Sequence, residues 1–148
     1  MFQKAGDRRG VALCLLRLAD LRMREGSHAT SRTGFEEALA AFHEIGDKHG
    51  IADTLRGLGL LDCASCRFER GVVLSAVSTQ LTDEIRSPRL DADQNEIDLA
   101  LALARKELGD EQFKQLWSQG LSRSADDVVD QVLAREGRTQ SARPDENG

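Results

Sequence analysis

Cys63 and Cys66 form a Cys-x-x-Cys motif, the pattern in this sequence whose chemistry is easiest to state. A redox function needs a thiolate at the start of a helix that follows a strand, and a zinc site needs four ligands. Here the motif falls near the end of a predicted helix, and no second Cys-x-x-Cys or His pair follows it. We therefore expect two small, half-buried residues at a helix end.

The glycines of "GLGLL", residues 57–61, are a second pattern with a chemical interpretation. A dinucleotide fingerprint would need a third glycine and a preceding strand, and this segment has neither. Close packing of helices at Gly59 explains it better. The sequence also contains no P-loop motif, so we expect no ATP site of that kind.

A third pattern is a run of carboxylates that falls where acids interact favourably with a helix N-terminus. We interpret this run as a capping region with a solvated face: Asp91, Asp93, Glu96 and Asp98. The three patterns together predict no catalytic residue, no metal site and no cofactor, and hence no enzyme.

The composition limits the class of partner. The chain has 148 residues, a net charge of −5 and a hydrophobic share of 40%. An acidic chain lacks the clustered basic face that nucleic acid requires, so we expect no direct nucleic-acid binding. No apolar run approaches the roughly 18 residues of a membrane span, and no secretory signal begins the chain. Three cysteines, an odd number, fit a reduced cytoplasmic setting.

Apolar residues recur at three- and four-residue steps, which predicts an all-α chain. The predicted helices span residues 9–25, 28–45, 51–64 and 68–85 and, after a break at Pro88, residues 91–108, 110–120 and 124–135. Asp91 or Asp93 can cap the fifth helix, and Ser124 the last. The tail, residues 137–148, lacks apolar residues and is expected to be disordered.

The segment "FQKAGDRRGVA" at residues 2–12 returns as "FHEIGDKHGIA" at residues 42–52, a shift of 40 residues. A repeat of this size predicts stacked antiparallel helical hairpins, here over residues 1–86, followed by C-terminal capping helices over residues 87–136. Small residues stand at equivalent places and favour close helix packing: Ala19 with Gly59, and Ser31 with Gly71.

Residues 15–47, "LLRLADLRMREGSHATSRTGFEEALAAFHEIGD", resemble a tetratricopeptide repeat of the longer variety of about forty residues. In the second copy, Ser75 and Ser78 replace the expected bulky and small apolar residues. The resemblance implies a tetratricopeptide-like α-solenoid of about two repeats with a C-terminal helical cap.

The later segment "LGDEQFKQLWSQGLSRSADDVVDQVL" is similar to the closing segment of large actinobacterial-type regulators. In that family a signalling ATPase domain precedes a helical-repeat sensor arm, and a LuxR-type DNA-binding domain often lies at one end. The resemblance implies a non-catalytic interaction and sensor arm of an ATP-dependent transcriptional regulator. The alternative is a free-standing adaptor that binds a partner peptide.

In tetratricopeptide arrays the first helix of each hairpin lines a groove for peptide or helical ligands. Carried over to this chain, the predicted groove consists of Leu16, Asp20, Met23, Arg24, Arg56, Leu60 and Cys63. The alternative is that the C-terminal helices fold back and cover this face.

Residues 1–7 align with residues 41–47, the last turn and stop of a second-hairpin helix, so we interpret them as the remnant of a preceding repeat. The first full helix is apolar on two sides, and Val11, Leu15 and Leu18 would then form an exposed apolar edge. We expect a fragment of a longer protein, a truncated gene product, or a chain that docks this edge on another subunit or on a second copy of itself.

Overall fold

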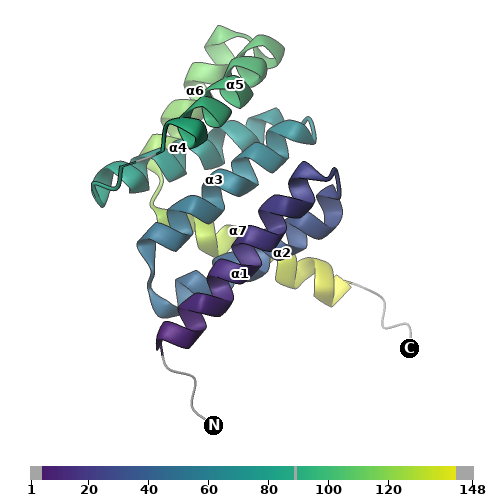
Figure 1. Ribbon diagram of the computed structural model, residues 1–148. Helices are drawn as coiled ribbons and strands as arrows, with labels where there is room; N and C mark the ends of the chain where they lie inside the picture. Colours follow the sequence, from purple (N-terminus) through teal and green to yellow (C-terminus); the bar gives the residue numbers. More distant parts are fainter. Residues whose placement is uncertain (1–4, 89, 143–148) are drawn as a thin grey trace.

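The computed structural model describes residues 5–88 and 90–142, and within them the chain forms seven helices and no strand (Figure 1). This confirms the predicted all-α class. The helices are α1 (Ala5–Arg24), α2 (His28–Ile45), α3 (Lys48–Ala64), α4 (Phe68–Glu84), α5 (Asp91–Leu108), α6 (Asp110–Ser122) and α7 (Ala125–Ala142).

The first four helices form two antiparallel hairpins, α1 with α2 and α3 with α4. The turn between the hairpins follows from local chemistry. Gly46 ends α2 with a φ of 71°, a left-handed conformation that glycine adopts without steric cost. Asp47 then caps α3, because its carboxylate accepts a hydrogen bond from the backbone N–H of Gly50 at 3.1 Å.

Small residues let the two helices of each hairpin approach closely at equivalent points. The Ser31 hydroxyl donates to the Ala19 carbonyl oxygen at 2.7 Å. One repeat later, a Cβ on Gly71 would lie only 3.1 Å from the Gly59 carbonyl oxygen. This confirms the predicted close packing at these pairs. Ser78, a departure from the repeat pattern, keeps α4 in place by donating to the Ala52 carbonyl oxygen at 2.8 Å.

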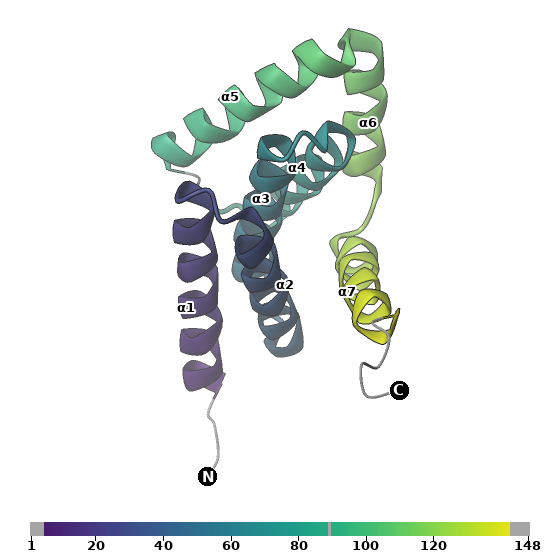
Figure 2. The same cartoon turned by 90° about the vertical axis from the view of Figure 1, so that its right-hand side faces the viewer.

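The C-terminal helices leave the hairpin pattern. α5 lies across α3 and α4, α6 packs along α4, and α7 returns to pack on α2 and α4 (Figure 2). A main core joins the two hairpins to α7, and its largest side chains include Phe35, Leu39, Phe42, Leu55, Leu58, Leu61 and Val129. A second cluster joins α3, α4, α5 and α6 around Cys63, Val72 and Ala104.

Several helix boundaries differ from the predicted ones, and α3, for example, begins at Lys48 and not at residue 51. α1 runs through Gly6 and Asp7, where the repeat predicted a stop, and in this first turn the Asp7 carboxylate suits the helix N-terminus. α7 extends to Ala142, so it includes residues 137–142, which were assigned to a disordered tail. The predictions for residues 1–4 and 143–148 lie outside the described residues.

In residues 5–88 and 90–142, no helix combines the length and the apolar character that crossing a bilayer would require.

Candidate interaction surfaces

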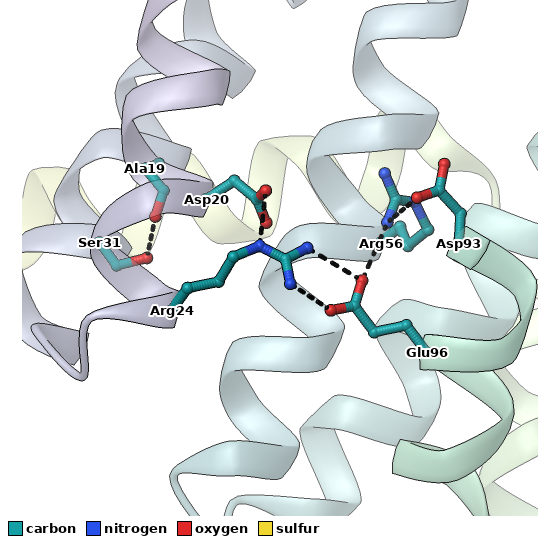
Figure 3. Close-up of polar contacts among 7 residues, drawn as sticks. All are labelled: Ala19, Asp20, Arg24, Ser31, Arg56, Asp93 and Glu96. Carbon is teal, nitrogen blue, oxygen red and sulfur yellow. Dashed lines mark hydrogen bonds and ion pairs between the residues drawn. The ribbon is translucent and has the colours of Figure 1, made fainter. Parts of the chain in front are cut away.

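The polar residues of the predicted groove come together in front of α3 (Figure 3). Arg24, from the last turn of α1, contacts Glu96 of α5 with an Nη1–Oε2 distance of 2.9 Å. The Arg24 Nε also donates to Asp20, one turn earlier on α1, at 3.1 Å. These hydrogen bonds, the one to Asp20 first and the one to Glu96 next, raise the pKa of Arg24. The Arg24–Glu96 pair therefore bridges α1 and α5 across the face of α3.

Arg56 of α3 extends this network. Its Nη1 lies 3.8 Å from the Asp93 Oδ1 and 4.0 Å from the Glu96 Oε1, and its side chain is only 16% exposed. Two guanidinium groups thus face three carboxylates, counting Asp20, over three helices. Every charged member of the predicted groove already has an intramolecular partner.

The interpretation of the α5 carboxylates needs correction at two positions. Asp93 and Glu96 form the ion pairs just described, and neither Asp91 nor Asp93 caps α5. Leu90 holds the N-cap position without a side-chain hydrogen bond. The physical reason lies outside the segment, since Arg24 and Arg56 attract these carboxylates after folding.

The apolar residues of the predicted groove are largely covered. Leu60 is 6% exposed and Cys63 is 4% exposed. Leu16 and Met23 are half-buried against the main core. Cys63 packs in the second cluster with Ala104 of α5. At Cys63, therefore, a C-terminal helix covers the predicted groove, as the alternative interpretation expected.

An apolar stripe on α1, in contrast, faces solvent. Val11 is 49% exposed, Leu18 46% and Leu21 52%, and Cys14 between them is also exposed. We call these four residues the α1 edge. They recur at three- and four-residue steps and so lie on one side of the helix. Leu15, predicted as part of the edge, is half-buried and packs against the main core. The sequence analysis did not assign Cys14 and Leu21 to this edge, although their three- and four-residue spacing from Val11 and Leu18 indicates the same side of the helix.

The Cys-x-x-Cys pair shows two different environments. Burial, followed by the nearby charge of Asp62, raises the pKa of Cys63 to about 11. Cys66 is exposed at the turn after α3, with a φ of 62°. A thiol that stays protonated at neutral pH is a poor nucleophile and a poor metal ligand.

Asp62 is a buried, ion-paired carboxylate that the sequence analysis did not single out. Its carboxylate is fully buried and lies 2.7 Å from the Arg32 Nη2 and 3.1 Å from the Arg70 Nε. Arg32 belongs to α2 and Arg70 to α4, so one carboxylate ties three helices together. A lone acid within the apolar run "GLGLLDCA" was the available signal, because a buried carboxylate needs charged partners.

Within the part of the chain that the structure describes, no group of three or more His, Cys, Asp or Glu residues is placed to hold a metal ion. Comparisons with known protein families, with curated proteins and with solved structures found no match.

Proposed function

We propose that this chain is a non-catalytic protein–protein interaction module, the helical-repeat sensor arm of an ATP-dependent transcriptional regulator. The observation that supports this most is the α1 edge. One side of α1 packs on α2, while Val11, Leu18 and Leu21 remain about half exposed on another. In stacked hairpins such a side is where the next unit packs, and an exposed apolar stripe marks a contact surface.

The size of the α1 edge favours a partner that is tethered to it. Full burial of a Val or Leu side chain is worth about 1.5–3 kcal/mol, so these half-exposed residues offer about 1 kcal/mol each. Their sum, about 3–4 kcal/mol, is smaller than most estimates of the association cost, about 4–15 kcal/mol. A domain in the same polypeptide largely avoids that cost, because a linker holds it at high effective concentration.

The alternative function is a free-standing cytoplasmic adaptor that binds a partner peptide in the predicted groove. Arg24 and Arg56 favour it, since guanidinium groups recognise carboxylates. Both already pair with Glu96, so a peptide would have to displace α5 carboxylates. In either role the chain contacts protein and has no nucleic-acid contact of its own, in keeping with its net charge of −5.

Photo-crosslinking in cells tests this function. A photoreactive amino acid replaces Leu18 on the α1 edge, and in a control chain it replaces Glu37, which is exposed on α2. We expect a discrete protein product from position 18 and none from position 37. Identical products from both positions, or no product from position 18, would contradict an interaction role for the α1 edge.

The identity of the product separates the two functions. A partner or preceding domain that contains a P-loop ATPase supports the regulator arm, as does a P-loop reading frame that ends just upstream of this one. A partner without a P-loop, together with crosslinks from position 23 in the predicted groove, supports the adaptor.

A further inference from the structure

The C-terminal helices α6 and α7 enclose a groove together with α4, on the side of α4 that lies away from α1. α6 packs along α4, the chain turns at Arg123, and α7 then packs on α2 and α4, so α6 and α7 diverge (Figure 2). The space between α4, α6 and α7 has a volume of about 500 Å³. We call it the C-terminal groove. Its volume lies within the range of about 300–1,000 Å³ that small-molecule sites occupy.

The floor of the C-terminal groove is apolar. Val73 and Leu74 come from α4, Leu116 from α6, and Val128 and Val132 from α7. Leu74, Val128 and Val132 are at most 4% exposed, so the floor is held by the core beneath it. A floor of this kind suits the hydrocarbon or aromatic body of a ligand.

The wall of the groove carries two arginines, Arg70 and Arg123. The half-buried Arg123 donates a hydrogen bond from its Nη2 to the amide oxygen of Gln131. No carboxylate of residues 7–88 or 90–134 lies within ion-pair distance of the Arg123 guanidinium, and the neutral Gln131 amide is its partner in this wall. Glu69, the acid of the wall, accepts a hydrogen bond from the Gln112 amide at 3.1 Å.

The charges on and behind this wall favour an anion. Arg70 is positioned by Asp62, which also holds Arg32. The charged residues that line the groove are Arg70, Arg123 and Glu69, which sum to +1 within a chain whose net charge is −5. A partly dehydrated guanidinium beside an apolar floor is a site where a carboxylate can form charge-assisted hydrogen bonds.

We propose that the C-terminal groove binds a small amphipathic carboxylate, with its acid group on Arg123 and its apolar body on Val73, Leu116 and Val132. Binding would bridge α4 to α6 and α7, and so couple the groove to the packing of the C-terminal helices. This site goes beyond the proposed protein contacts and does not depend on them, because it uses other helices and other residues.

Methyl NMR of the full chain during titration with 4-phenylbutyrate tests the proposal. The neutral analogue of this acid, 4-phenyl-1-butanol, has the same apolar body without the charge. We expect saturable shifts at the methyl groups of Val73, Leu116, Val128 and Val132, and at least tenfold weaker binding of the alcohol. Arg123→Gln should weaken binding of the acid at least tenfold and leave that of the alcohol unchanged.

The control is Leu18→Glu on the α1 edge, a second exposed apolar surface, and this substitution should change the affinity for neither the acid nor the alcohol. Three results would overturn the proposal: shifts centred on the α1 edge or on the exposed Leu99 and Leu103 of α5, equal affinities for the acid and the alcohol, or Arg123→Gln without effect. A negative result for ligand binding in the C-terminal groove would leave the crosslinking result at position 18 unaffected, so the two proposals are tested separately.

Discussion

At the scale of single residues, Asp62 carries the largest expected effect. Removing one partner of a buried ion pair costs about 3–5 kcal/mol, because the remaining charges lose their compensation. Arg32 and Arg70 keep roughly a fifth of their side chains in water, which lowers that cost. We expect Asp62→Ala to reduce the free energy of unfolding by about 2–3 kcal/mol in urea denaturation.

The control for Asp62 is Glu37→Ala, which removes an exposed acid from α2 and should stay within about 0.5 kcal/mol of wild type. Equal effects of the two substitutions would show that the Asp62 ion pairs do not stabilise the hairpins.

The cysteines give a second prediction at this scale. With a pKa of about 11, only about one Cys63 thiol in a thousand is ionised at pH 8. Iodoacetamide should therefore modify the exposed Cys14 and Cys66 of the native chain and leave Cys63 unmodified until urea unfolds it, as read by peptide mass spectrometry. Rapid native-state modification of Cys63 would reopen a redox role for the pair.

At the scale of helices, the junction between α2 and α3 gives a pH-dependent prediction. Burial opposes the charge of Asp47, but hydrogen bonds from the Gly50 N–H and from Arg9, the latter at 2.7 Å, outweigh it and lower the pKa of Asp47. A lowered pKa in the folded state stabilises the fold above the unfolded pKa, about 3.9, and this stabilisation is lost as the pH falls through the folded value.

Asp47→Ala should therefore cost about 1 kcal/mol at pH 7, and the gap to wild type should narrow below about pH 4. Asp47→Asn, which retains an oxygen for the cap without the charge, should cost less at pH 7. Unfolding curves at several pH values measure both. A gap between wild type and Asp47→Ala that widens in acid would contradict this account.

Element prediction succeeded where local chemistry decides the outcome. Gly46 stops α2 and Ser124 caps α7, as its hydroxyl accepts from the Asp127 N–H at 3.1 Å, and both signals lie within a few residues of the boundary. Leu15 shows the limit of this reasoning. Its spacing allows either face of α1, and only the position of the main core turns it inward.

The candidate site was less predictable because its contacts join distant parts of the sequence. Glu96 reaches Arg24 over 72 residues, and no local pattern specifies which of several α5 carboxylates will do so. The tetratricopeptide resemblance likewise placed Leu60 and Cys63 in an open groove, and no local pattern shows that both are buried or that Cys63 packs with Ala104 of α5.

At the scale of the whole molecule, α1 lies on one side of α2 and α4, and α6 and α7, which line the C-terminal groove with α4, lie on the other (Figure 2). In isolation the α1 edge has only other copies of the chain to cover it. Two edges burying each other gain about 6–8 kcal/mol, and an association cost of at least about 4 kcal/mol leaves no more than about 4 kcal/mol, so the expected Kd is about 1 mM or weaker. Self-association should therefore be weak and concentration-dependent.

Cys14, in the middle of the α1 edge, makes the most direct measurement possible. A short bismaleimide crosslinker is added to the Cys66→Ser chain, in which Cys14 is the exposed cysteine, and to the matched Cys14→Ser chain, in which Cys66 is. At about 1 mM protein we expect dimers through Cys14 to form at least tenfold faster than dimers through Cys66. Val11→Lys with Leu18→Glu should abolish that excess without loss of helix. Equal rates through Cys14 and Cys66, unchanged by these substitutions, would contradict the claim that the α1 edge is a protein contact surface.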